Sequence, residues 1–427
     1  MKKKILALIQ KKKTKDFFIY GLGQAINIIS PLLITPYLIY TCGLENLGII
    51  ALGQSFAFIL IVLVDYSSYI IGVKDVSINR DFPDILENVF NTIYAAKLFL
   101  LTLVFLITAL LIFFIPYFNN NWLVLFFSFS IIIGQFINPT WFFQGTENFK
   151  WITIINILSK IIYILGVFLF IKKQSDFVLA NLWLGLGAII ANFIGVVYIL
   201  KKYKFNFKNI STADIKHLLI KDFSFCISQL FFAIRNYSSV MIIGFFAGNY
   251  IAGQFKVIDQ IIGLLRTYLQ MFFKFSYSYV CFEIDKNLSK GITLWKKFNG
   301  LNFGLLALIL IAIYFLSDAV LHFFRVEKNL FSLLKNYLHI ALLIPLLTGI
   351  TLPLEQLIFS LNKNRQYITL TIASTCLNII IMSLLMHYFG LMQVFILLII
   401  TEVSLITIYY IILKPYFNKA NLDFIKD

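Results

Sequence analysis

The chain has 427 residues, of which 60% are hydrophobic and 17% aromatic, and its net charge at pH 7 is +16. This composition excludes an ordinary soluble globular domain and predicts an integral membrane protein. The basic residues lie in short segments between apolar runs, as membrane topology favours, so the positive charge does not indicate binding to nucleic acid.

The apolar residues form twelve stretches, each long enough to cross a bilayer as a helix. The basic segment before the first stretch has no signal-peptide cleavage site, and we expect it to be a retained cytoplasmic tail. The predicted fold class is an all-α integral membrane protein. Its twelve transmembrane helices are expected at 17–40, 48–70, 92–115, 122–143, 151–171, 178–200, 223–246, 252–280, 300–316, 338–360, 368–387 and 391–413.

The distribution of lysine and arginine predicts the orientation in the membrane. An even number of spans places both termini on one side, and 25 of the 36 Lys and Arg residues lie in the tails and connections on that side. Five lie in the connections on the opposite side. The positive-inside rule therefore predicts that both termini are cytoplasmic.

A basic connection at 201–222 divides the spans six and six. We expect a six-helix bundle at 1–200, this segment as a cytoplasmic linker, and a second six-helix bundle at 223–427. A weak parallel repeat relates the halves at an offset of 205 residues, because Gly43 and Gly248 occupy equivalent positions between the first two spans of each half. Transporters built from repeats often bind substrate where the repeats meet.

Three polar residues inside spans of the first half are candidate substrate contacts: Gln24 and Asn27 in span 1 and Lys160 in span 5. For Gln24 and Asn27, the alternative is a hydrogen bond to a neighbouring helix. Lys160 lies one turn from Asn156 and offers a cation to an anionic ligand. Its alternative is to extend toward the membrane interface.

Span 8 carries a polar stripe along one face of an otherwise apolar helix. The stripe extends over about 27 Å, close to the thickness of the hydrocarbon core. Charges are costly against lipid at that depth, so we expect the stripe to face a water-filled, cationic cavity. Its members are Lys256, Asp259, Gln260, Gly263, Arg266, Thr267, Gln270 and Lys274.

Cations of the second half are the leading candidates for binding phosphate. Arg235 in span 7, Arg266 and Lys274 have no obvious acidic partner nearby in the sequence, and guanidinium and ammonium groups both suit phosphate oxygens. Lys256 is a further candidate. Its spacing of three residues from Asp259 also allows a structural salt bridge.

Three carboxylates are candidates for ion coupling: Glu402 in span 12, Asp65 near the cytoplasmic end of span 2, and Asp259. A buried carboxylate can carry a proton through a transport cycle. Glu402 is equally suited to pair with a cavity cation, and a capping or interfacial role is favoured for Asp65. The scattered histidines and cysteines form no catalytic or metal-ligand constellation, and no nucleotide-binding motif is present, so we expect neither an enzyme nor a cofactor.

Three segments resemble the Wzx-type O-antigen flippases, which belong to the polysaccharide transporter branch of the multidrug/oligosaccharidyl-lipid/polysaccharide superfamily. They are FFIYGLGQAINIISPLLITPYLIYTCGLENLGIIALGQS at 17–55, NPTWFFQGTENFK at 138–150 and GNYIAGQFKVIDQI at 248–261. The resemblance implies two six-helix bundles around a central cationic cavity, working by alternating access in the bacterial inner membrane. It also implies that Arg235, Lys256, Arg266 and Lys274 are cavity cations.

The substrate implied by the resemblance is an undecaprenyl-diphosphate-linked oligosaccharide, moved from the cytoplasmic to the periplasmic leaflet. The implied partners are this lipid-linked oligosaccharide, membrane lipid and the O-antigen polymerase machinery, with no nucleic acid. Related lipid II flippases usually have fourteen spans, and related drug extruders move cations, so both fit less well.

Two other functions stay open. An O-antigen polymerase or ligase is disfavoured, because such enzymes have a long periplasmic loop and the largest one expected here is 317–337. An exporter of another lipid-linked anionic polymer precursor differs only in its cargo. In 138–150, the aromatic residues are expected to anchor a helix end at the membrane interface rather than to contact ligand, with Glu147 and Lys150 in solvent.

Overall fold

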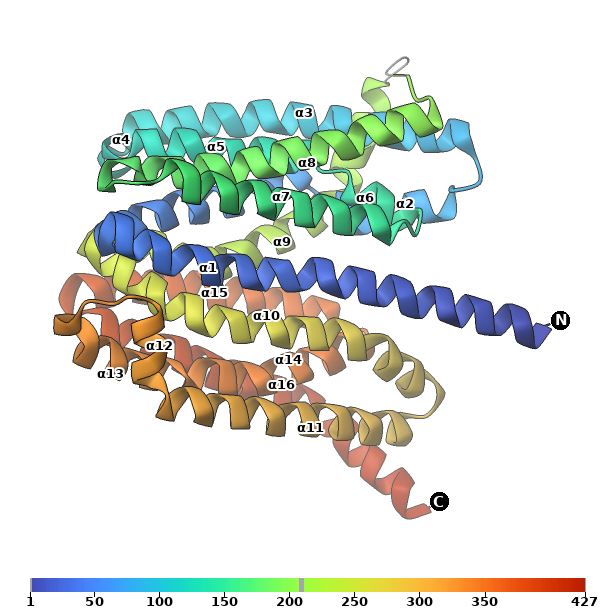
Figure 1. The fold of residues 1–427 in the computed structure, drawn as a ribbon. Coiled ribbons are helices and arrows are strands. Elements are labelled where there is room, and N and C mark those ends of the chain that lie inside the picture. Colours follow the sequence, from blue (N-terminus) through green and yellow to red (C-terminus); the bar gives the residue numbers. More distant parts are fainter. Residues whose placement is uncertain (1, 207–210, 427) are drawn as a thin grey trace. The chain divides into compact units, whose positions relative to one another are not determined.

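The computed structural model describes residues 2–206 and 211–426. Side chains are described in these ranges except at 2–22, 24, 25, 28, 275, 278, 364 and 421–426. Every regular element in the described chain is a helix (Figure 1), so the predicted all-α class is confirmed. Helices dominate because a segment inside hydrocarbon has to satisfy its own backbone N–H and C=O groups.

The helices separate into two compact units, Met1–Met241 and Ile242–Asp427. The boundary lies inside α9, whose first part packs on the first unit, and the division predicted at 201–222 stays a prediction. The helices that begin in the first unit are α1 (Lys2–Asp65), η1 (Ser68–Gly72), α2 (Val73–Ile78), α3 (Pro83–Phe114), α4 (Pro116–Asn120), α5 (Trp122–Ile137), α6 (Thr140–Gly145), α7 (Phe149–Phe170), η2 (Gln174–Val178), α8 (Leu179–Tyr203) and α9 (Thr212–Ala247).

The second unit contains the polar-striped helix α10 and a further set of apolar helices. They are α10 (Asn249–Lys286), α11 (Leu288–Phe315), α12 (Ser317–Phe323), η3 (Lys328–Leu330), α13 (Phe331–Ala341), α14 (Leu343–Ser360), α15 (Asn364–Tyr388) and α16 (Leu391–Lys426).

Gly43 and Gly248 share an unusual backbone conformation. Their φ and ψ angles are 82° and 170° at Gly43 and 88° and 165° at Gly248, a region that essentially only glycine occupies. Gly43 divides α1 into two helices, and Gly248 separates α9 from α10. An added Cβ would meet no atom within 4 Å at either position, so the backbone angle alone requires glycine. The backbone therefore supports the internal repeat predicted from the sequence.

Ten helices in the described chain are long and apolar enough to cross a membrane. Two features explain why twelve stretches were predicted. The segment Ile29–Asp65 counts once although Gly43 divides it, and α10 is not among the ten because its polar stripe lowers its hydropathy. A twelve-helix membrane fold is consistent with these helices.

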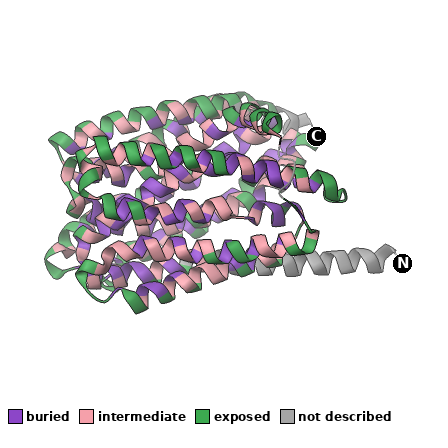
Figure 2. Cartoon of the chain, turned by 90° about the horizontal axis from the view of Figure 1, so that it is seen from above, coloured by how far each residue is buried: buried purple, intermediate pink, exposed green. Residues whose placement is uncertain are grey.

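Small residues bring the helices of the first unit close together. An added Cβ would lie 1.9 Å from Ser130 Oγ at Gly185 and 2.3 Å from the carbonyl oxygen of Ser159 at Gly187, so α8 approaches both α5 and α7 closely. Buried and exposed residues alternate in stripes along the helices (Figure 2), as expected where one face meets protein and the other meets lipid.

The aromatic residues of helix α6 lie in a different environment from the one predicted. Its residues Trp141, Phe142 and Phe143 are at most 2% exposed and belong to a core cluster with residues of α3, α7 and α8. The prediction that they anchor a helix end at the membrane interface is therefore wrong, because they fill the space between these helices. Glu147 and Lys150 are exposed, as predicted.

Candidate functional site

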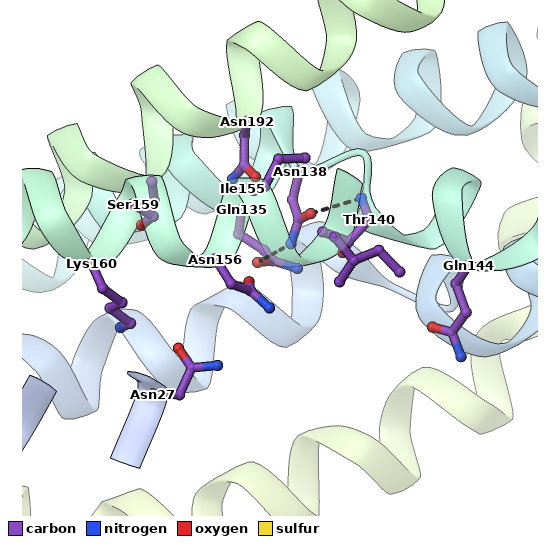
Figure 3. Close-up of a pocket in the computed structure, with 12 residues that line it drawn as sticks. Asn27, Gln135, Asn138, Thr140, Gln144, Ile155, Asn156, Ser159, Lys160 and Asn192 are labelled. Atoms are coloured by element: carbon purple, nitrogen blue, oxygen red, sulfur yellow. Dashed lines mark hydrogen bonds between the residues drawn. The ribbon is translucent and has the colours of Figure 1, made fainter. Parts of the chain in front are cut away.

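A cavity of about 310 Å³ lies within the first unit (Figure 3). Its lining comes from α1, α5, α6, α7 and α8 and includes six carboxamides, two hydroxyl groups and one lysine. Polar groups at this density are costly inside a membrane fold unless a ligand or water binds them, so the cavity is the candidate site. The lining residues are Asn27, Gln135, Asn138, Thr140, Gln144, Ile152, Ile155, Asn156, Ser159, Lys160, Ala188 and Asn192.

Three of the carboxamides are held by the protein itself. Gln135 donates from Nε2 to Asp65 Oδ1 at 3.1 Å, and Asn138 donates from Nδ2 to Gln135 Oε1 at 3.1 Å. Asn138 Oδ1 in turn accepts the backbone N–H of Thr140 at 2.9 Å. Asn192 donates to a backbone carbonyl of α5 at 2.7 Å. These side chains form a wall whose orientation is fixed before any ligand binds.

Three other polar side chains are open to a ligand. Asn156 and Gln144 make no side-chain hydrogen bond within the described part of the chain. Lys160 has no carboxylate within ion-pair distance among the described residues, and its Nζ lies 6.0 Å from the centroid of the Tyr163 ring. Lys160 and Asn156 point from α7 toward the space that Asn27 of α1 also enters (Figure 3). The cavity thus offers one cation beside carboxamides.

A buried ion pair adjoins the fixed wall. Lys97 of α3 is 1% exposed, and its Nζ lies 2.9 Å from Asp65 Oδ1 at the end of α1. The rings of Tyr94 and Trp141 lie 6.0 and 5.9 Å from the same ammonium group. A cation–π contribution is expected at these distances. Lys97 is therefore compensated within the protein.

The surroundings of Asp65 explain its burial. Asp65 Oδ1 accepts a hydrogen bond from Ser68 Oγ at 2.7 Å and another from Gln135 Nε2 at 3.1 Å, in addition to that from Lys97. The predicted capping or interfacial role is wrong, because donors from η1, α3 and α5 enclose the carboxylate. A role of Asp65 in ion coupling stays a prediction.

The other predicted site residues of the first unit have different positions. Asn27 and Lys160 line the cavity, as their place in the spans indicated. The side chain of Gln24 lies outside those that the structure describes. Arg235 is half-buried on α9 and does not line this cavity, so its predicted contact with phosphate stays a prediction.

The striped helix α10 carries the predicted cations of the second unit. Lys256 and Asp259 form a salt bridge of 3.6 Å with both side chains 21% exposed, which is the pairing that their spacing allowed. Arg266 is half-buried and Lys274 is exposed on the same helix. Their roles in binding substrate, and that of Asp259 in ion coupling, stay predictions.

Glu402 of α16 accepts a hydrogen bond from Thr351 Oγ1 at 2.6 Å. Its role in ion coupling also stays a prediction. Among the described residues, no group of three or more His, Cys, Asp or Glu side chains is placed to hold a metal ion.

Most of the cavity lining was missed by sequence reasoning. Asn138, Thr140 and Gln144 come from the segment in which ligand contact was disfavoured, and the aromatic residues between them drew the interpretation toward membrane anchoring. The sequence signal that could have identified these lining residues is the presence of two carboxamides and a hydroxyl within seven residues at the end of a predicted span. Lys97 was also missed, because its partner is 32 residues away on another helix.

Solved transporters of the MOP superfamily have a similar fold. The chain is similar to an inward-facing multidrug resistance MATE family transporter, with a TM-score of 0.60 and 15% identity over 94% of this chain and 95% of that one. It is also similar to a MOP superfamily transporter from Pyrococcus furiosus, with a TM-score of 0.58 and 15% identity over 95% of each chain. Likeness at such identities shows the fold alone.

Two curated bacterial proteins are similar in sequence, and each is named "Putative O-antigen transporter". The protein from Escherichia coli strain K12 is 27% identical over 276 residues, which cover 64% of this chain and 66% of that protein. The protein from Shigella dysenteriae is 22% identical over 254 residues, which cover 58% of this chain and 62% of that protein. The chain thus matches slightly less than two thirds of the length of these relatives.

A family model described as polysaccharide biosynthesis protein matches residues 14–278, which is more than half of the chain and includes every residue that lines the cavity. The family resemblance predicted from the sequence is confirmed by this match. The chain belongs to the polysaccharide biosynthesis protein family.

Proposed function

We propose that the chain is a flippase for an undecaprenyl-diphosphate-linked oligosaccharide, such as an O-antigen repeat unit. It would move this substrate from the cytoplasmic to the periplasmic leaflet of the bacterial inner membrane by alternating access. The observation that carries the proposal is a polar cavity among membrane-spanning helices, with a lysine that has no counter-ion among the described residues. The family and the names of the relatives agree with this function.

The physical problem of flipping such a lipid matches this cavity. A glycan and a diphosphate cannot enter hydrocarbon without losing hydration that costs several kcal/mol per polar group. Carboxamides and a lysine replace that hydration with hydrogen bonds and charge. The polyprenyl chain is apolar, so it can stay in the lipid while the head group crosses.

A diphosphate is anionic and is therefore expected to bind cations. Our proposal assigns the diphosphate to the cations of spans 7 and 8, and the polar residues of the first unit to the remaining head group. Carboxylates inside the spans are the candidates for the coupling ion. The proposed diphosphate contacts are Arg235, Lys256, Arg266 and Lys274, the further substrate contacts are Lys160, Gln24 and Asn27, and the coupling candidates are Glu402, Asp259 and Asp65.

The proposed orientation follows the positive-inside rule, with both termini in the cytoplasm. In the proposed function, the lipid-linked unit is delivered to the periplasmic leaflet. An O-antigen polymerase is the expected partner there, because polymerisation consumes flipped units.

Deletion of the gene in its native host tests the function. Lipid-linked intermediates and surface polysaccharide would be measured in the deletion strain and after complementation. The proposal predicts that no repeat units reach the surface and that single units accumulate at the cytoplasmic face. Single units that appear outside without polymer would show that translocation is intact and that the chain acts in polymerisation instead.

Variants of the cations test the assignment of the diphosphate. Arg266→Ala and Lys256→Ala are expected to reduce surface polysaccharide more than Lys328→Ala, because Lys328 is exposed in η3 outside the stripe. The charge-conserving substitutions Arg266→Lys and Lys256→Arg should retain activity if charge is what matters. Intact transport after neutral substitution of all four proposed cations would remove the basis for this assignment.

A further inference from the structure

We propose that the cavity of the first unit is a subsite for one sugar that carries a single acidic group. Lys160 would bind the acidic oxygens, and Asn156 would bind ring hydroxyls. The inference rests on the proposed function and names the part of the substrate that this cavity recognises.

The charge of the cavity supports a single anionic group. Lys160 is the one ionisable side chain among the twelve described residues that line it. It lies eleven residues after Phe149 along α7, about 17 Å into the spanning helix and so near the middle of the hydrocarbon layer. An ammonium group at this depth is costly without an anion, and no described carboxylate supplies one. The ligand is therefore the source of the missing charge.

The single positive charge of Lys160 also distinguishes an acidic sugar from the diphosphate as the ligand of this cavity. A diphosphate brings two phosphate groups, each with its own negative charge, and would leave excess negative charge beside one lysine. The described lining includes no arginine, which is the side chain best suited to bind phosphate through two parallel hydrogen bonds. One carboxylate, or one phosphate substituent on a sugar, matches the single ammonium group.

The neutral part of the lining matches a sugar ring. Ring hydroxyls both donate and accept hydrogen bonds, and a carboxamide offers both functions in one planar group. Asn156, one turn from Lys160, has these functions unused within the described chain, whereas Gln135, Asn138 and Asn192 use theirs to hold the wall in place. An open carboxamide beside fixed ones provides a binding group on a rigid frame.

The size of the cavity limits what fits. A volume of about 310 Å³ is at the small end of the range of roughly 300–1,000 Å³ that is typical of ligand pockets. Asn156 and Lys160 are one helical turn apart, about 6 Å along α7, which is comparable to the width of a sugar ring with its substituent. The cavity therefore has room for one sugar residue.

Binding to the purified full-length protein in detergent tests the inference. The probes are glucuronate, glucose and inorganic diphosphate, and the readout is the shift of the thermal unfolding midpoint as each probe is titrated. Wild-type protein is compared with Lys160→Met, with Asn156→Leu and with Lys328→Met as the matched lysine control. We expect wild-type protein and Lys328→Met to bind glucuronate about tenfold more tightly than glucose, since a charge-assisted contact has this magnitude.

The two cavity variants separate charge recognition from hydroxyl recognition. Lys160→Met should abolish the preference for glucuronate, and Asn156→Leu should weaken both sugars while keeping the preference. Equal binding of glucuronate and glucose by wild-type protein, or a preference that survives in Lys160→Met, would overturn the inference. Binding of diphosphate that is lost in Lys160→Met, without binding of glucuronate, would also overturn it and assign Lys160 to the lipid phosphate. None of these outcomes alters the deletion experiment, which measures transport without reference to this cavity.

Discussion

Two lysines inside the membrane helices of the first unit have opposite surroundings. Lys97 is 1% exposed and lies 2.9 Å from Asp65, with two aromatic rings around its ammonium group. Lys160 faces a cavity, and the described part of the chain provides no carboxylate for it. The first lysine has its counter-ion within the unit, whereas the described residues of the unit supply none for the second.

This difference separates stability from binding. Removing one partner of a buried ion pair leaves an uncompensated charge, which is strongly destabilising. Removing a lysine that has no partner relieves an unfavourable charge in the unliganded protein. Substitutions of the two lysines should therefore act on different properties of the same unit.

The largest effect on stability is expected for Lys97→Met. The substitution leaves the carboxylate of Asp65 buried without its lysine partner. We therefore expect a loss of about 3–5 kcal/mol in the free energy of unfolding. Thermal unfolding of purified protein in detergent measures this loss. The double variant Lys97→Met with Asp65→Asn should recover most of it, and a double variant no more stable than the single one would contradict the ion pair as its cause.

A smaller loss is expected for Gln135→Leu, because Gln135 links the ion pair to the cavity. The substitution removes a hydrogen bond to Asp65 and leaves Asn138 Nδ2 without its acceptor. Two such losses amount to about 1–3 kcal/mol, and the unfolding midpoint should fall accordingly. An unchanged midpoint would show that the wall does not depend on this side chain.

A third lysine, Lys256, extends the comparison to the second unit. Its salt bridge with Asp259 is longer, at 3.6 Å, and both side chains are 21% exposed. Partly exposed pairs of this kind contribute little, so Lys256→Met should change the free energy of unfolding by less than about 1 kcal/mol. A loss as large as that of Lys97→Met would mean that this pair is structural and would argue against Lys256 as a substrate contact.

The smallest effect on stability is expected for Lys160→Met. No described ion pair is lost, and a buried charge is replaced by an apolar side chain of similar length. The unfolding midpoint should stay the same or rise. A fall comparable to that of Gln135→Leu would indicate that Lys160 is part of the fold and would remove the distinction between the two lysines.

The fold was largely predictable because the local sequence, through the length of its apolar stretches, determines where membrane-spanning helices form. Apolar length predicted the spans, and the spacing of Gly43 and Gly248 predicted a repeat that appears in matching backbone angles. The striped helix was recognised by its periodicity. These signals act within one helix or one turn, so no tertiary information was needed.

The site was predictable only in part because it is assembled from five helices. Lys160 and Asn27 were found because polar groups stand out within apolar spans. The carboxamides of α5 and α8 were not, since a single Asn or Gln in a span equally suggests a helix–helix hydrogen bond. Gln135 in fact makes such a bond and also lines the cavity. The partner of Lys97 was hidden for the same reason, because pairing across helices depends on tertiary packing.

Transport by Lys160→Met, measured in the deletion strain at matched membrane levels of protein, tests the central claim most directly. The account predicts that this variant, although as stable as the wild type, accumulates single lipid-linked units at the cytoplasmic face and delivers little surface polysaccharide. Lys328→Met should restore wild-type levels in the same assay. Full surface polysaccharide from Lys160→Met would contradict the claim that the lysine of this cavity serves the substrate.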